Sequence, residues 1–139
     1  MRFLGVDVGT KRIGLAISDE LGIIAQSLLT LSCTTPENDT RKLIEIARQH
    51  NVEKIIVGLP KNMNGTLGKS AEHVLSFIQG IKEVTNIPVQ VWDERLSTVA
   101  VNRTLLSANT SRRRRKEVVD KLAAVYILQG FLDSHRRLN

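Results

Sequence analysis

Apolar residues in the first third of the chain are grouped in short runs of the kind that form β-strands. Three such runs cover residues 2–8, 12–18 and 23–31, and turn-forming residues separate them. Runs of this length between turn residues are typical of strands, and tight connections favour antiparallel neighbours. The pattern therefore predicts a three-stranded antiparallel meander at the start of the chain.

The spacing of apolar residues becomes helical after residue 36. Leu43, Ile44 and Ala47 share one face of a helix over 40–50, and Pro36 lies just before it as an N-terminal signal. Strands and helices then alternate, with strands over 54–57 and 89–92 and helices over 70–84, 98–106 and 117–132. This alternation implies right-handed crossovers and parallel strand pairing.

Together these elements predict an α/β fold, in which a mixed five-stranded sheet has three antiparallel strands followed by parallel strands and is flanked by helices. The 139 residues, without repeats or long linkers, fit a single domain over 1–139. Ligands of open α/β sheets bind beyond the carboxyl ends of the parallel strands. Asp7, Gly58 and Glu94 all lie at such ends, so we expect one site there.

The composition is that of an ordinary globular protein, with 42% hydrophobic and 24% charged residues. No apolar stretch approaches the roughly 20 residues of a membrane span. The N-terminus runs directly into an apolar strand, which does not resemble a signal peptide. Cys33 is the only cysteine, which excludes an internal disulfide and a cysteine-based metal cluster. We therefore expect a cytoplasmic protein that does not bind membranes.

The net charge of +6 comes from one segment of the chain. Five of the 20 basic residues are consecutive, and the other 15 nearly balance the 14 acidic residues. The five are Arg112, Arg113, Arg114, Arg115 and Lys116. Such a patch suits contact with a phosphate backbone, although a solvated charge run fits the pattern equally well. Its position directly before the helix that contains Asp120 favours nucleic acid.

Three carboxylates stand in apolar surroundings, where an unpaired charge is costly. Asp7 ends an apolar strand, Glu94 follows another, and Asp120 lies within an apolar helix. A shared Mg²⁺ or Mn²⁺ ion would remove that cost, because both ions prefer carboxylate oxygens. The histidines, at 50, 73 and 135, lack the spacing of a zinc ligand pair, so zinc is disfavoured.

Each acid also has an ordinary structural interpretation. Asp7 fits a turn aspartate, and Glu94 can pair with Arg95 or Arg103. Asp120 can form a buried ion pair with Lys116. Asp93 competes with Glu94, because adjacent strand residues point to opposite faces and the local pattern does not choose between them.

Four segments of the chain resemble one bacterial family, the YqgF-type family of pre-16S ribosomal RNA nucleases and Holliday junction resolvases. They are GVDVGTKRIG at 5–14, VGLP at 57–60 with NMNGT at 62–66, WDERLST at 92–98 and DKLAAVYILQ at 120–129. The resemblance covers nearly the whole chain and implies an RNase H-like fold. It also implies that Asp7, Glu94 and Asp120 are the catalytic, metal-binding positions.

These observations predict metal-assisted hydrolysis of a phosphodiester, with Mg²⁺ or Mn²⁺ as cofactor. Other groups are candidates for substrate contact. Thr10, Lys11, Arg95 and the basic run 112–116 would bind phosphates, and Asn62, Asn64 and Gly65 would shape a loop over the substrate or form a plain surface turn. Precursor ribosomal RNA is the favoured substrate, branched DNA is the alternative, and association into a homodimer is left open.

Two other functions fit part of the pattern. The segment DVGT at 7–10 also resembles the first phosphate loop of the actin, Hsp70 and sugar-kinase ATPases, but those proteins enclose ATP between two such domains. A non-catalytic RNA-binding factor for ribosome assembly would keep the fold and the basic run. ATP binding tests the first alternative, and metal binding with cleavage tests the second.

Overall fold

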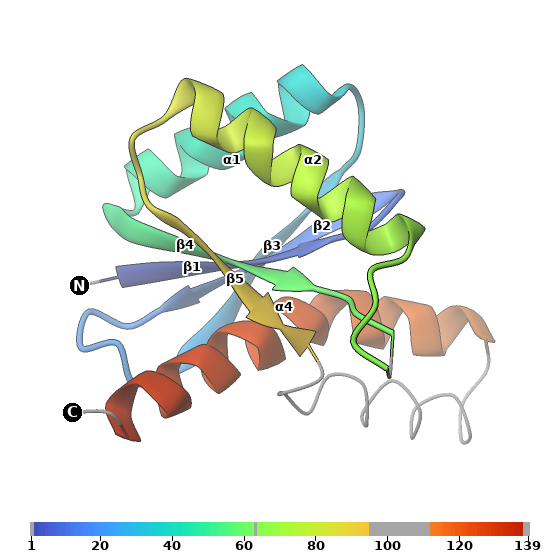
Figure 1. Ribbon diagram of the computed structural model, residues 1–139. Helices are drawn as coiled ribbons and strands as arrows, with labels where there is room; N and C mark the ends of the chain where they lie inside the picture. The colour runs from blue at the N-terminus through green and yellow to red at the C-terminus, as the bar shows by residue number, and fades with distance from the viewer. Residues whose placement is uncertain (1, 63, 95–111, 138–139) are drawn as a thin grey trace.

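The computed structural model describes residues 2–62, 64–94 and 112–137, and the side chains of 2–62, 64–94 and 122–135. The predicted helix over 98–106 lies outside these residues. The described elements are β1 (Arg2–Val8), β2 (Arg12–Ser18), β3 (Ala25–Ser32), α1 (Pro36–Gln49), β4 (Val52–Leu59), α2 (Lys69–Val84), β5 (Val89–Asp93) and α4 (Arg112–Arg137) (Figure 1).

The strands form one mixed sheet in the order β3-β2-β1-β4-β5. β1 pairs antiparallel with β2, and β2 pairs antiparallel with β3. β1 pairs in parallel with β4, and β4 pairs in parallel with β5. The predicted α/β fold and its sheet are thus confirmed, and the strand that ends with Asp7 and Val8 lies at the centre of the sheet.

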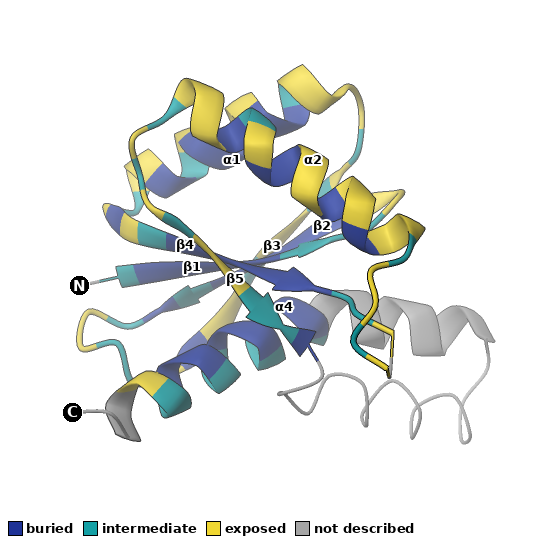
Figure 2. Ribbon diagram, viewed as in Figure 1, coloured by how far each residue is buried: buried dark blue, intermediate teal, exposed yellow. Residues whose placement is uncertain are grey.

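Alternate residues of β1 point to opposite faces of the sheet, as the strand period requires. Leu4 and Val6 pack in the core under α1 and α2, whereas Phe3 packs in the core under α4. Figure 1 shows α1 and α2 on one face and α4 on the other, and Figure 2 shows their buried sides turned toward the sheet. Asp7 follows Phe3 and Gly5 in this alternation and therefore faces the α4 side.

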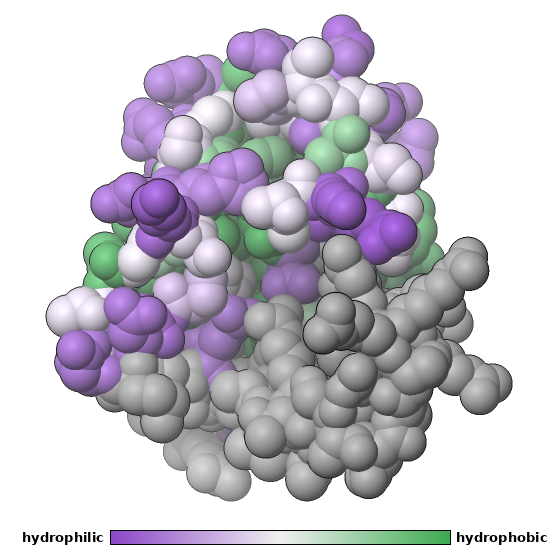
Figure 3. All heavy atoms as spheres, turned by 90° about the vertical axis from the view of Figure 1, so that its right-hand side faces the viewer, coloured by the Kyte–Doolittle hydropathy of each residue, from purple (hydrophilic) through white to green (hydrophobic). Residues whose placement is uncertain are grey.

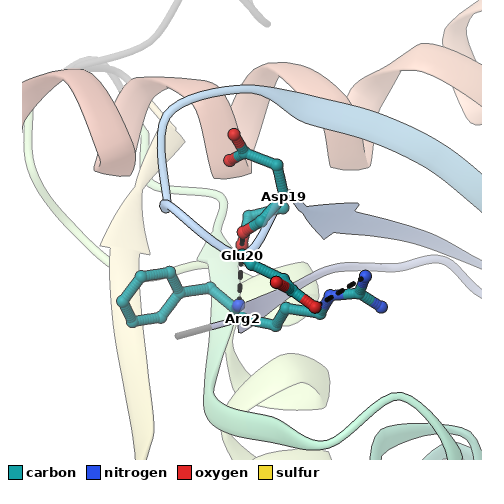
Figure 4. Close-up of polar contacts among 5 residues, drawn as sticks. Arg2, Asp19 and Glu20 are labelled. Atoms are coloured by element: carbon teal, nitrogen blue, oxygen red, sulfur yellow. Dashed lines mark hydrogen bonds and ion pairs between the residues drawn. The ribbon is translucent and has the colours of Figure 1, made fainter.

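Polar contacts join the start of β1 to the end of β2 (Figure 4). The Phe3 amide donates to the buried Ser18 Oγ at 2.8 Å, and the Arg2 guanidinium pairs with the Glu20 carboxylate at 3.8 Å. In the following turn, Asp19 Oδ1 accepts from the amides of Ile23 and Ile24 at 2.7 and 3.1 Å. These bonds fix the β2–β3 connection.

The helix boundaries differ from the sequence prediction at two N-termini. α1 begins at Pro36 rather than after it, because the Thr35 side chain accepts from the Asn38 amide and caps the helix. α4 begins at Arg112 rather than at residue 117. Arginine and lysine are good helix formers, so the basic run 112–116 extends this helix instead of forming a connector before it.

Candidate active site

Asp7 stands at the carboxyl end of the central strand, with glycines beside it on both neighbouring strands. Its Cα pairs with Gly14 of β2. Val6 pairs with Val57 of β4, so the next step of the parallel register brings Asp7 beside Gly58. Asp7 is half-buried, and both glycines are buried. Neither neighbour of Asp7 therefore has a side chain of its own on the α4 side of the sheet.

Glu94 comes to the same part of the sheet from β5. It directly follows the strand and is buried, with an exposed fraction of 7%. Its Cγ atom lies 3.3 Å from the position that a Cβ atom on Gly58 would occupy, and Ile127 of α4 lies over the same spot. The Glu94 side chain thus lies over Gly58, on the face to which Asp7 points. The two acids converge on Gly58 from opposite sides.

Asp93 points the other way. Its Cα pairs with Leu59, which packs in the core under α1 and α2. Asp93 Oδ2 is 3.8 Å from Lys61 Nζ, at the base of the connection between β4 and α2. The sheet register therefore separates the two adjacent acids, with Glu94 on the face of Asp7 and Asp93 on the opposite face.

Helix α4 runs antiparallel to β1 and lies very close to it. The rings of Phe3 and Phe131 meet edge to face with centroids 5.7 Å apart. Two residues further along β1, a Cβ atom on Gly5 would lie only 2.9 Å from the Ala124 carbonyl oxygen. From Phe3 toward Asp7 along β1, the α4 residues in contact with the strand therefore lie closer and closer to the helix N-terminus. The backbone of Asp120, one turn before Ala124, lies toward the Asp7 end of the sheet.

The third predicted acid is described only by its backbone. Asp120 lies within α4, and its side chain is outside the described part of the structure. Ala123, Ala124, Ile127 and Phe131, which lie at spacings that place them on the helical face of Asp120, are all buried in the core between α4 and the sheet. Among the side chains that are described, no group of three or more His, Cys, Asp or Glu could hold a metal ion.

The turn between β1 and β2 presents two of the predicted phosphate contacts. Thr10 and Lys11 are exposed, and the turn is closed by a bond of 2.9 Å from the Gly9 amide to the Arg12 carbonyl. The Cys33 thiol also contacts this turn and donates a hydrogen bond to the Gly9 carbonyl at 3.7 Å. Burial raises the pKa of the Cys33 thiol, and the nearby Asp39 carboxylate raises it further. The thiol therefore stays protonated and can act as this donor.

The remaining predicted contacts are only partly described. Arg95 lies outside the described residues, and for the basic run 112–116 only the helical backbone is described. Asn62, Asn64 and Gly65 form a turn between β4 and α2, at the end of the sheet where Asp7 and Glu94 lie. Hydrophilic side chains cross the described part of this end of the molecule (Figure 3).

Two further observations bear on the sequence predictions. His73 and His135 are exposed, and His50 binds the Ile46 carbonyl of its own helix at 2.9 Å. Among the described helices, none is long and apolar enough to cross a membrane. Gly58 was expected at this edge of the sheet, whereas Gly14 and Lys61 were not, because only the strand register and the fold bring them next to the acids.

A family model and named relatives both match nearly the whole chain. The model of the RuvX family, described as "Holliday junction resolvase", matches residues 1–134. A protein of Clostridium acetobutylicum named "Putative pre-16S rRNA nuclease" is 52% identical over 134 residues, which cover 96% of this chain and 99% of that protein. A protein of the same name from Clostridium kluyveri is 53% identical over 133 residues, 96% of this chain and 97% of that one.

Solved structures share the fold at low sequence identity. The chain is similar to T. thermophilus RuvC in complex with Holliday junction substrate, with a TM-score of 0.63, 13% identity and coverage of 99% of this chain and 96% of that one. For Thermus thermophilus RuvC in a second structure the TM-score is 0.58 at 15% identity, with coverage of 99% and 97%. These likenesses confirm the RNase H-like fold that the sequence resemblance implies.

Proposed function

Because the chain belongs to the RuvX family, we propose that it is a metal-dependent endonuclease that hydrolyses phosphodiester bonds in the precursor of 16S ribosomal RNA. One observation carries the proposal. Asp7 and Glu94 converge on Gly58 at the carboxyl end of the central strand, where a sheet of this kind binds its ligands. The family and its named relatives support nuclease chemistry, and the proposal assigns it to these acids.

In this proposal Asp7, Glu94 and Asp120 hold Mg²⁺ or Mn²⁺. Their donor atoms fit, since hard divalent ions prefer carboxylate oxygens. A bound ion would supply an acidified water as nucleophile and stabilise the charge on the leaving oxygen. Asp7 is the anchor, because it lies at the carboxyl end of the central strand. Glu94 is buried and is held in a fixed direction between Gly58 and α4.

The substrate backbone would be held by the basic and polar groups around these acids. Thr10 and Lys11 lie in the exposed turn that follows Asp7, and Arg95 follows Glu94 in the sequence. The basic run 112–116 opens the helix that leads to Asp120. We propose that these groups bind phosphates without reading bases. The chain has only 4% aromatic residues, which are too few for extensive base stacking.

A branched DNA substrate is the second candidate, favoured by the family description "Holliday junction resolvase". The named relatives at 52 to 53% identity favour the RNA substrate. Because ribosomal RNA precursors are processed in the bacterial cytoplasm, the cytoplasm is the compartment that this function requires.

The proposal is tested with purified full-length protein, a labelled fragment of precursor 16S rRNA and a labelled four-way DNA junction. We expect cleavage of the RNA in Mg²⁺ or Mn²⁺, loss of cleavage in EDTA, and no cleavage by Asp7→Asn. Titration calorimetry with Mn²⁺ should show binding to the wild type and weaker binding to Asp7→Asn. Cleavage of the junction alone would assign the branched DNA substrate. Absence of both metal binding and cleavage would leave the non-catalytic RNA-binding function.

A further inference from the structure

Between β4 and α2, the described residues 61–62 and 64–67 form a hairpin. Lys61 and Leu67 form an antiparallel bridge, and the Asn62 amide donates to the Thr66 carbonyl at 3.0 Å. The Gly65 amide donates to the Asn62 carbonyl at 2.8 Å, and Gly65 has a φ of 86°, which glycine adopts without strain. This connection is therefore a defined turn rather than an irregular loop.

The Thr66 hydroxyl links both asparagine side chains of the hairpin. It accepts from Asn62 Nδ2 at 2.9 Å and donates to Asn64 Oδ1 at 2.7 Å. Asn64 Oδ1 also accepts from the Thr66 amide at 3.1 Å. Although Asn62, Asn64 and Thr66 are all exposed, these polar groups bind one another. They shape the hairpin and are not primarily donors for a ligand.

The base of the hairpin is attached to β5 immediately before Glu94. Lys61 Nζ lies 3.8 Å from Asp93 Oδ2, and the two side chains have exposed fractions of 30% and 15%. Since Asp93 and Glu94 are adjacent and their side chains lie on opposite faces, a contact that fixes Asp93 also fixes the backbone that carries Glu94. A partly exposed pair of this length contributes little to overall stability. We therefore expect the Lys61–Asp93 ion pair to affect where the base of the hairpin lies relative to β5, and not the overall stability of the fold.

We propose that Lys61, Asp93 and Thr66 are positioning residues. They hold the described part of the hairpin, residues 61–62 and 64–67, as a rigid wall beside Glu94, against which the sugar–phosphate backbone of the substrate strand lies. This inference rests on the proposed nuclease function, and it gives Asp93 a role distinct from that of Glu94. Figure 1 shows the hairpin, in green between β4 and α2, at the end of the sheet to which the β4 and β5 arrows point.

The ion pair is tested with Lys61→Met, its conservative variant Lys61→Arg, and Lys54→Met as the matched control. Lys54, in β4, is also half-buried, and its replacement removes the same single charge. Its contacts are with Gln90 and the Phe131 ring, not with Asp93. We expect Lys61→Met to raise KM about fivefold over Lys54→Met, with kcat little changed. Lys61→Arg should restore the wild-type KM. Equal KM values for Lys61→Met and Lys54→Met would overturn the proposal.

The hydroxyl of Thr66 is tested with Thr66→Val and Thr66→Ser. Valine keeps the shape of threonine but neither donates nor accepts, so Thr66→Val should raise KM as Lys61→Met does. Thr66→Ser retains the hydroxyl and should behave as the wild type. A Thr66→Val protein with the wild-type KM would contradict the proposed role. Thermal melting of each variant checks that the fold is retained.

A binding measurement distinguishes failure of this inference from failure of the proposed function. The dissociation constant for the labelled RNA fragment is measured by fluorescence anisotropy, without turnover. If the wild type binds RNA but does not cleave it, the nuclease function fails, and weaker binding by Lys61→Met than by Lys54→Met still supports the wall. If the wild type cleaves and the two variants bind and cleave alike, the positioning role alone is rejected.

Discussion

The Cγ atom of Glu94 lies 3.3 Å from the point where a Cβ atom on Gly58 would stand. This close approach brings the Glu94 side chain from the edge strand β5 over β4, toward Asp7 on the central strand. Any side chain at position 58 would occupy that space. Gly58 is thus required by the packing of its neighbours and not by an unusual backbone conformation.

Replacement of Gly58 by alanine should therefore disturb both stability and the site. The added methyl group would contact Glu94 and Ile127, and we expect a loss of about 1 to 3 kcal/mol in the free energy of unfolding, as for other overpacked positions. Mn²⁺ affinity should fall as well, because Glu94 is displaced. Urea denaturation and titration calorimetry measure the two effects.

Gly80→Ala is the matched control for this substitution. Gly80 lies within α2, where a Cβ atom would make an ordinary contact of 3.7 Å with Thr40 Oγ1. We expect it to stabilise the protein by up to about 1 kcal/mol, since alanine is the better helix former. A Gly58→Ala protein as stable as Gly80→Ala would show that the close packing at Gly58 is not restrictive.

A similar argument applies to Gly5, where α4 meets β1. A Cβ atom there would lie 2.7 Å from Leu128 Cβ and 2.9 Å from the Ala124 carbonyl oxygen. The second contact is with helix backbone, which cannot rotate away, so Gly5→Ala should push α4 from the sheet and lower the melting temperature. It should also lower nuclease activity through Asp120. An unchanged melting temperature would contradict the tight helix–strand contact.

The basic run at the start of α4 should govern the salt dependence of nucleic-acid binding. Replacing Arg112 and Arg113 with glutamine should weaken binding and reduce the slope of log K against log salt by about 0.7 to 0.9 for each phosphate that the variant no longer neutralises. Arg41→Gln with Lys42→Gln removes the same charge from an exposed part of α1 and serves as control. Equal slopes for the two double variants would show that the run does not contact phosphates.

The turn between β2 and β3 should weaken in acid. Hydrogen bonds from the Ile23 amide, and then from the Ile24 amide, hold the pKa of the Asp19 carboxyl below its ordinary value of 3.8. Because the pKa is lower in the folded state, the ionised carboxylate stabilises the fold above the unfolded pKa. That contribution is lost as the pH falls through the folded pKa, and protonation therefore removes it in the region below about pH 4.

NMR titration of the Asp19 carboxyl carbon measures this pKa directly, and Asp19→Asn provides the comparison for stability. Between pH 6 and pH 3 the wild type should lose more stability than Asp19→Asn, since only the wild type loses an ionised acceptor. Parallel stability curves for the two proteins would contradict the assignment.

The order of the described elements, the mixed sheet and the strand ends at which Asp7 and Glu94 stand could all be predicted from the amino-acid sequence alone. These features depend on local properties, namely the period of apolar residues and the placement of turn formers, which can be read without knowing the fold. The resemblance of four segments to one family then indicated the chemistry of the site.

The spatial neighbours of these residues could not be predicted in this way and follow from the fold. The choice between Asp93 and Glu94 depends on the register of β5 against β4, and a shift of one residue would exchange their faces. Only pairing between strands that are distant in sequence places Gly14 and Gly58 beside Asp7. The run 112–116 was expected directly before the last helix, because its charges interrupt the apolar pattern, and the structure shows that it continues α4. Contacts of this kind are set by packing between elements, and that information is not local in the chain.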